Sequence, residues 1–191
     1  METKAVVFEE QRKLALSPVT LTPPGEDDIV VRVQWSGIST GTEKLLWTGD
    51  MPPFPGMGYP LVPGYESVGE VVECAANSNV KVGDMVFVPG ANCYQDVKGL
   101  FGGAARTLVT KADRVAQIDT SLGELGVLLA LAATAHHALT PFATEICKPD
   151  LIVGHGTLWR LIARLAVALG CPLPPVWQNP RDRLPGGEGS L

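Results

Sequence analysis

The sequence has few of the residues that build metal-binding or disulfide-linked frameworks. Its 191 residues include four cysteines and three histidines, and no two cysteines form a CxxC pair. Zinc fingers and small secreted scaffolds need closely spaced ligands or dense cysteine pairs, so both classes are excluded. We interpret the cysteines as reduced and mostly buried thiols.

The sequence also lacks an excess of positive charge and a long apolar run. Its 15 Lys and Arg against 20 Asp and Glu leave a net charge of −5, which disfavours binding to nucleic acid. The N-terminal METKAVVFEE lacks the apolar core of a signal peptide. The most apolar stretch, residues 125–139, is shorter than the ~20 residues of a membrane helix and contains His136 and His137. We therefore expect a cytoplasmic protein.

Short β-strands are predicted over the first part of the chain. Runs of β-branched and aromatic residues indicate strands at 4–8, 28–35, 65–74, 85–88 after a turn at Gly83-Asp84, and 102–118, the last holding two. Gly69 inside one run indicates a bulge or a close backbone approach. Turn signals fill residues 17–28, and the Gly and Pro density of residues 37–64 excludes long regular elements. This pattern predicts a small barrel or sandwich.

The hydrophobic period then changes to that of a helix. Residues 121–139 have helical spacing, with Ser121 as the predicted N-cap and Glu124 completing a capping box. An apolar strand at 149–156, a helix at 157–170 and a further strand at 174–179 predict part of a doubly wound nucleotide-binding sheet.

The predicted fold is thus α/β, built as a β-rich domain followed by a partial dinucleotide-binding domain. We assign residues 1–125 to the first domain and 126–178 to the second. Residues 179–191 are polar and rich in glycine, and we expect this tail to be disordered.

A glycine turn between strand and helix is the cofactor signal. Gly154 would permit the tight turn, and Gly156 would let a pyrophosphate approach the helix N-terminus. Trp159 replaces the third glycine of the usual motif, so we expect its indole to displace the helix or turn outward. The expected acidic residue is not evident, since the next strand ends in Gln178 and Asn179. A glycine-rich turn without any ligand is the alternative.

The order of these parts resembles the medium-chain dehydrogenase/reductase superfamily. The matching segments are SGISTGTE, PGYESVGEV, VKVGDMVFV, FGGAARTLVTKADRVAQI, ATAHHAL and LIVGHGTLWRLIARLAVALG. This resemblance implies an N-terminal chaperonin-10-like barrel followed by a Rossmann domain. Within the superfamily, the loops WTGDMPPFPGMGYPLVPGYE and PGANCYQDVKGLFGGAA are similar to those of the bacteriochlorophyllide dehydrogenase family.

That resemblance implies a reaction, a cofactor and partners. The family oxidises the 3-(1-hydroxyethyl) group of a chlorophyllide-type tetrapyrrole to 3-acetyl with NAD, although the residues themselves do not separate NAD from NADP. The implied cofactor-binding residues are Thr134, Gly154, His155, Gly156, Thr157 and Leu158. The apolar substrate leaves peripheral membrane contact open. Trp35, Trp47, Met51, Phe54, Met57, Tyr59 and Phe101 could line an apolar cleft for it, with core packing as the alternative.

The resemblance also implies a site without metal. Zinc dehydrogenases of the superfamily place their ligands where this chain has Ser39, Tyr65 and Ala130, which cannot build a tetrahedral zinc site. A general base must then accept the alcohol proton, and the candidates are Glu43, Tyr65, Glu66 and His136. Structural roles remain open: Glu66 as a support, Tyr65 packed on a pocket wall and His136 in the core.

Superfamily members have about six strands in the nucleotide domain, and this sequence shows about two. We expect a chain cut short, whose exposed strand edges promote self-association, including homo-oligomers, and which binds cofactor poorly. Two other functions stay open. One is a zinc-free quinone or enoyl reductase of the same superfamily, and the other is a non-enzymatic β-domain that binds a pigment or a partner subunit.

Overall fold

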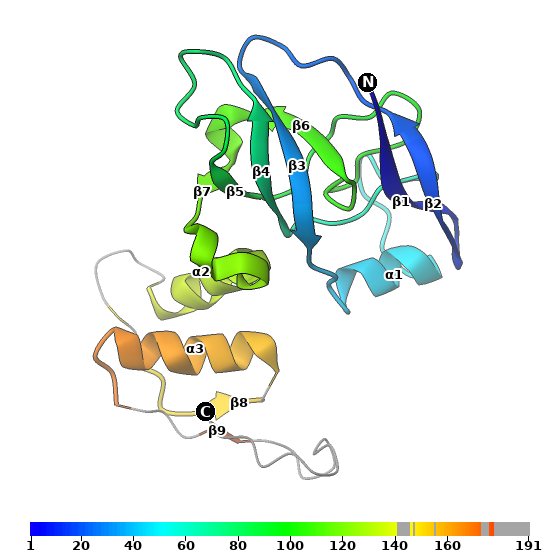
Figure 1. Ribbon diagram of the computed structural model, residues 1–191. Helices are drawn as coiled ribbons and strands as arrows, with labels where there is room; N and C mark the ends of the chain where they lie inside the picture. The colour runs from blue at the N-terminus through cyan, green and yellow to red at the C-terminus, as the bar shows by residue number, and fades with distance from the viewer. Residues whose placement is uncertain (141–145, 147, 155, 173–175, 178–191) are drawn as a thin grey trace. The chain divides into compact units, whose positions relative to one another are not determined.

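The computed structural model describes residues 1–140, 146, 148–154, 156–172 and 176–177 (Figure 1). The chain divides into two compact units, Met1–Leu128 and Leu129–Leu191. The sequence-based boundary lay between residues 125 and 126. The predicted tail, residues 179–191, lies outside the described residues.

A five-stranded antiparallel sheet forms most of the first unit. Its strands are β3 (Asp28–Ser36), β4 (Ser67–Glu73), β5 (Met85–Val88), β6 (Thr107–Lys111) and β7 (Ala116–Gln117), in the order β6-β3-β4-β5-β7. Apolar residues of these strands, such as Ile29, Val31 and Leu108, are fully buried in the core. Their runs of β-branched and aromatic residues are the pattern that predicted the strands.

A hairpin of β1 (Glu2–Glu10) and β2 (Lys13–Thr20) completes the β-structure of this unit. The interpretation of residues 17–28 as turn was therefore wrong over its first four positions. Pro18 lies opposite Lys4 in the two-stranded sheet, where an edge strand tolerates a residue without an N–H group. The Val6 N–H donates to Ala104 O (2.9 Å), which joins the hairpin to the segment before β6.

The bulge predicted at Gly69 is confirmed. The register between β3 and β4 shifts between Val33 and Trp35, directly opposite Gly69. A Cβ atom at Gly69 would lie 2.3 Å from Arg32 O, so only glycine allows the two backbones to approach this closely.

The proline- and glycine-rich stretch contains one short helix that the sequence did not reveal. This helix, α1 (Thr42–Thr48), ends at Gly49, whose φ of 83° gives a left-handed cap. Leu46 of α1 is fully buried against Phe8 and Leu61. This contact fixes α1 against β1 and the Leu61 segment.

The helical region begins differently from the predicted capping box. A short 3₁₀ turn, η1 (Ala112–Arg114), precedes β7, and the 3₁₀ segment η2 (Thr120–Leu128), interrupted at Gly123, follows it. The Ser121 N–H donates to Asp119 Oδ1 (2.8 Å), so Asp119 supplies the cap that Ser121 was expected to give. The prediction failed because a better acceptor lies two residues earlier.

Helix α2 (Leu129–Leu139) continues directly from η2. Among the described residues, the 20-residue stretch Thr120–Leu139 is long and apolar enough to cross a membrane, judged by length and composition only. The expectation that no stretch reaches this length was therefore wrong. The core helix of a soluble protein passes the same test.

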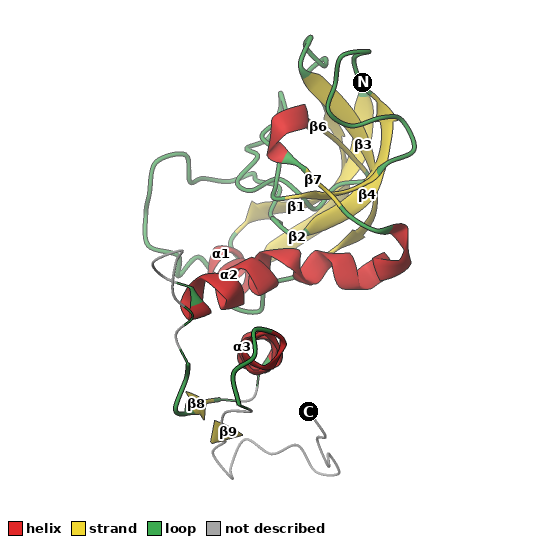
Figure 2. Cartoon of the chain, turned by 90° about the vertical axis from the view of Figure 1, so that its left-hand side faces the viewer, coloured by secondary structure: helices red, strands yellow, loops and turns green. Residues whose placement is uncertain are grey.

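The second unit contains a β-α-β element. Strands β8 (Ile152–Val153) and β9 (Val176–Trp177) pair in parallel, with α3 (Thr157–Ala168) between them in the chain. Figure 2 shows α3 end-on, with β8 and β9 side by side. Helices α2 and α3 bury small and aliphatic residues between them, including Ala135 and Ala163. The predicted doubly wound nucleotide-binding sheet is built from such elements.

Candidate functional site

The candidate site of the first unit lies where three segments meet. Strand β3 ends at Ser36, β4 begins at Ser67, and α1 begins at Thr42. The Gly37 N–H donates to Glu66 O (2.8 Å), which holds the residues after β3 beside those before β4. The sheet therefore brings the GISTGTE and GYES segments together, although 20 or more residues separate them in the sequence.

Two hydroxyl groups face each other in this region. Tyr65 Oη lies 3.3 Å from Thr42 Oγ1, and either oxygen can be the donor. Both residues are half-buried. Ser39 Oγ accepts the N–H of Thr42 (3.2 Å), so it fixes the first turn of α1 that carries the threonine. Tyr65 and Thr42 therefore form a pair of hydroxyl groups that can exchange protons and that are partly accessible to solvent.

Two buried carboxyl groups accompany the hydroxyls. Glu43 and Glu66 are only 7% and 6% exposed. Burial raises the pKa of Glu43, the negative charge of Glu66 raises it further, and hydrogen bonds from the backbone of Glu43 and from Ser39 oppose the rise. Burial likewise raises the pKa of Glu66. Each carboxyl group therefore holds its proton more firmly than an exposed glutamate does.

The space around these carboxyl groups is tightly defined. Glu43 Oε2 is buried without a hydrogen-bond partner. A Cβ atom at Gly37 would lie 2.5 Å from Glu66 Oε2, so the absent side chain at Gly37 makes room for that carboxyl group. An unpartnered buried oxygen is costly, and such groups concentrate at functional sites.

An aromatic pair borders the hydroxyls. The rings of Tyr65 and Phe101 meet edge to face, with centroids 5.3 Å apart and planes inclined by 69°. Ser67 Oγ donates to Gly103 O (2.7 Å), and the Gly103 N–H donates to Gly64 O (2.8 Å). These bonds fix the Phe101 segment beside the Tyr65 segment.

Three of the seven predicted cleft-lining side chains pack in the core. Met51, Met57 and Tyr59 pack against the core cluster around Leu46, in agreement with the core alternative. Trp35, Trp47 and Phe101 are 37%, 38% and 40% exposed, respectively. Of the aromatic set, Phe101 is the one whose ring pairs with a candidate catalytic residue.

The structure thus brings together three of the four predicted acid–base residues. Glu43, Tyr65 and Glu66 lie in one region, together with Thr42, which sequence reasoning missed because a lone threonine carries no distinctive signal. His136 belongs to the second unit, where it is exposed and its Nδ1 lies 3.2 Å from Thr140 Oγ1. The alternative interpretation of His136 as a core residue was wrong.

The glycine turn of the second unit follows β8. Gly154 has a φ of 124°, a conformation that favours glycine, and Gly156 precedes the first turn of α3 without a side-chain cap. Thr157 and Leu158 occupy that first turn, whereas His155 lies outside the described residues. The uncapped N–H groups are the donors that a phosphate group uses at a helix N-terminus.

The Trp159 side chain lies close to the backbone of this turn. A Cβ atom at Gly154 would lie 2.5 Å from the indole Cδ1, and Trp159 is 41% exposed. The indole therefore lies against the glycines of the turn rather than turning outward, and it crowds the space in which a pyrophosphate would approach the helix N-terminus. Thr134, a further predicted cofactor residue, donates its hydroxyl to Ala130 O (3.0 Å) within α2.

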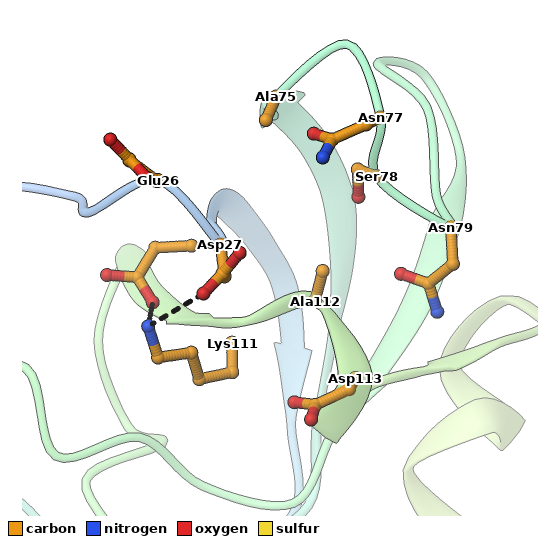
Figure 3. Close-up of a pocket in the computed structure, with 10 residues that line it drawn as sticks. Glu26, Asp27, Ala75, Asn77, Ser78, Asn79, Lys111, Ala112 and Asp113 are labelled. Carbon is orange, nitrogen blue, oxygen red and sulfur yellow. Dashed lines mark ion pairs between the residues drawn. The ribbon is translucent and has the colours of Figure 1, made fainter.

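An open cavity of about 520 Å³ lies elsewhere on the first unit (Figure 3). Its lining includes Asp27, Asp28 and Lys111, whose Nζ lies 3.2 Å from Asp28 Oδ1 and 4.0 Å from Asp27 Oδ2. Asp28 begins β3 and Gly37 follows its end, so about 30 Å of strand separates the cavity from the candidate site. None of the predicted site residues lines it.

Comparison with known proteins decides the family. Residues 25–120 match the alcohol dehydrogenase GroES-like domain family. The chain belongs to this family. The five-stranded sheet and the residues that border the candidate site are therefore those of a GroES-like domain, as the sequence motifs predicted.

Two curated relatives of this dehydrogenase family match almost the whole chain. It is 55% identical, over 99% of its length, to 2-desacetyl-2-hydroxyethyl bacteriochlorophyllide A dehydrogenase of Rhodobacter capsulatus. It is 54% identical, again over 99% of its length, to the protein of the same name in Cereibacter sphaeroides. The chain spans about 60% of the length of each relative.

Solved dehydrogenase structures share the fold. A cinnamyl alcohol dehydrogenase from Sorghum bicolor superposes with a TM-score of 0.75 at 21% identity, over 96% of this chain and 60% of that one. An alcohol dehydrogenase (rspB) from E. coli CFT073 gives a TM-score of 0.72 at 17% identity, over 95% of this chain and 64% of that one. At these identities the likeness concerns the fold alone.

The side chains at the candidate site do not suit a tetrahedral zinc ion. Ser39 and Tyr65 stand at two of the positions where the resemblance places ligands. Within the described part of the chain, no three His, Cys, Asp or Glu side chains converge on a point where a metal ion could bind. A serine hydroxyl and a phenol do not provide the soft or borderline ligands that zinc prefers.

Proposed function

We propose that the chain carries the substrate site of a zinc-independent dehydrogenase that oxidises the 3-(1-hydroxyethyl) group of a bacteriochlorophyllide to 3-acetyl. The hydroxyl pair of Tyr65 and Thr42, 3.3 Å apart beside two buried carboxyl groups, is the observation that carries the chemistry. The two curated relatives, whose names state a hydroxyethyl bacteriochlorophyllide, support the substrate class.

The site residues would manage the alcohol proton. Oxidation removes a hydride from the carbinol carbon and a proton from the hydroxyl oxygen. Tyr65 Oη accepts the proton from the substrate hydroxyl as its own proton moves to Thr42 Oγ1, and Thr42 in turn releases its original hydroxyl proton toward a carboxylate, so the pair relays the proton without a metal ion. The ionised form of Glu43 or Glu66 is the final acceptor, because a raised pKa makes a carboxylate a stronger base.

The cofactor that we propose is NAD. When bound, it supplies the hydride acceptor. The N–H groups of Thr157 and Leu158 would hold its pyrophosphate above Gly154 and Gly156, provided that the exposed Trp159 side chain turns aside. Two dehydrogenases that share the fold support a nicotinamide cofactor, since their structures hold NADP and NADH.

We infer the cellular location of the enzyme from the chemistry of its proposed substrate. A chlorophyllide is flat and apolar, so we propose a cytoplasmic protein that makes peripheral contact with the membrane. The apolar stretch Thr120–Leu139 supports such contact by composition. The β8–β9 sheet has two strands among the described residues, and a sheet edge without a partner strand supports self-association.

The proposal is tested by incubating the purified protein with NAD⁺ and a 3-(1-hydroxyethyl) bacteriochlorophyllide. We expect formation of NADH and the absorption change of the 3-acetyl product in equal amounts. The 3-vinyl analogue, which lacks the hydroxyl, is the matched control and must give neither signal. Reduction of a quinone or enone without alcohol oxidation would instead support the reductase. Pigment binding without turnover would support the non-enzymatic β-domain.

A further inference from the structure

Phe101 has a backbone conformation that its side chain disfavours. Its φ is 63°, and Arg12, with a φ of 60°, is the other non-glycine residue in this region among the described residues. A bulky residue in the left-handed region is a rare outlier, because its Cβ crowds the neighbouring peptide. Glycine would occupy the position without strain.

The surrounding backbone imposes this conformation. The Ala91 N–H donates to Phe101 O (2.6 Å), and the Gly102 N–H donates to Val62 O (3.0 Å). A Cβ atom at Gly90 would lie 2.2 Å from Phe101 O, so the neighbouring loop fits closely around the Phe101 carbonyl. The turn is therefore fixed whichever side chain is present at position 101.

Packing of the ring in the core does not explain the phenylalanine. Its side chain is 40% exposed and is not part of the buried clusters of the unit. Its aromatic partner is Tyr65, whose hydroxyl meets Thr42. The ring thus has one edge-to-face contact with a site residue and leaves apolar surface open to solvent beside the hydroxyl pair.

We propose that Phe101 determines substrate specificity by giving the flat macrocycle of the substrate an aromatic surface on which to stack. Stacking there would place a short side chain of the macrocycle at the Tyr65 hydroxyl, because the two rings are in contact. A strained residue kept beside a reactive group, where glycine would fit better, agrees with a role in binding. The inference rests on the proposed function and adds to it the residue that selects an aromatic macrocycle over a small alcohol.

The test compares Phe101→Gly with wild type and with the matched control Arg12→Gly. Arg12 has almost the same φ but lies in the turn between β1 and β2, so its replacement relieves similar strain away from the ring. Each 191-residue protein is titrated with 3-(1-hydroxyethyl) bacteriochlorophyllide a, followed by the pigment absorption and the quenching of tryptophan fluorescence. Thermal unfolding is measured in parallel.

We expect Phe101→Gly to raise the dissociation constant about tenfold, consistent with loss of an aromatic stacking contact. Its unfolding temperature should equal or exceed that of wild type, Arg12→Gly should bind like wild type, and Phe101→Trp should retain affinity.

Three results would overturn the inference. Unchanged affinity in Phe101→Gly would reject the stacking surface and leave the proposed substrate intact. A marked loss of stability in that variant, or equal weakening in Arg12→Gly, would show that the residue serves the fold. If wild type does not bind the pigment at all, both the stacking surface and the proposed substrate are wrong.

Discussion

Replacement of Glu43 by glutamine should stabilise the protein at neutral pH and lose that effect in acid. The carboxyl group of Glu43 is buried, its Oε2 has no hydrogen-bond partner, and Glu66 adds a repelling charge. The start of α1 opposes this cost, because the N-terminus of a helix favours a negative charge. Burial is the largest cause of the pKa shift, so the net effect disfavours the ionised form.

The sign of the pH dependence follows from the direction of that shift. The pKa of Glu43 is raised in the folded protein above its ordinary value of 4.5. Its contribution to stability is therefore fully present below pH 4.5 and is lost as the pH rises through the raised value. Glutamine does not titrate, so the difference between E43Q and wild type should be small at pH 4 and grow toward pH 7.5.

The magnitude follows from the cost of the buried charge. A buried polar group without a partner costs about 1–3 kcal/mol and a charged one costs more; glutamine keeps a polar group there but removes the charge, so we expect E43Q to raise the free energy of unfolding by about 1–2 kcal/mol at pH 7.5. For a chain of this length the gain corresponds to a rise in Tm of roughly 2–8 °C. Urea unfolding at pH 4.0, 5.5 and 7.5 measures it directly.

Glu73→Gln is the control, because Glu73 is an exposed glutamate at the end of a strand in the same unit. It should change stability by less than about 0.5 kcal/mol at every pH. The reasoning would be refuted by destabilisation in E43Q at pH 7.5, or by a difference from wild type that is the same at all three pH values.

Three further changes probe the catalytic, cofactor and folding arguments. Tyr65→Phe removes the relay hydroxyl and should lower kcat for alcohol oxidation by about 10²–10⁴-fold while leaving the unfolding temperature nearly unchanged; a normal kcat would remove Tyr65 from the mechanism. Trp159→Gly uncovers the turn at Gly154 and should tighten NAD⁺ binding in calorimetric titration, whereas weaker binding would mean that the indole contacts the cofactor. Gly69→Ala inserts a Cβ 2.3 Å from Arg32 O and should cost about 1–3 kcal/mol in urea unfolding; a neutral result would contradict the close strand approach.

The sequence predicted the elements that are rich in β-branched residues or have a helical period, and it missed those fixed by tertiary contacts. The strands around Val31 and Val71 were evident from their runs of β-branched residues. Strand β2 was missed because Pro18 is a turn signal, and only its edge position makes it acceptable in a sheet. Helix α1 was missed because its stability depends on burial of Leu46 rather than on its flanking prolines and glycines.

The sequence identified residues of the candidate site, but it did not reveal their spatial arrangement. The positions of Glu43, Tyr65 and Glu66 followed from a resemblance to known dehydrogenases, whereas their burial and the raised pKa values needed the packed structure. The partnership of Tyr65 with Thr42 depends on two loops meeting at the ends of separate strands. The strain at Phe101 depends on a torsion angle that is set by the neighbouring loop, and no local sequence pattern encodes it.

The way the β1–β2 hairpin is attached has a consequence for the kinetics of folding. The Thr107 N–H donates to Thr3 Oγ1 across 104 residues of sequence, and the Thr20 N–H donates to Asp96 Oδ1 across 76. Contacts between residues so far apart in the sequence require closure of very long chain loops, which slows folding. During synthesis the first hairpin must wait for residues about one hundred positions later, so its apolar strand edges stay exposed to aggregation or to capture by chaperones until then.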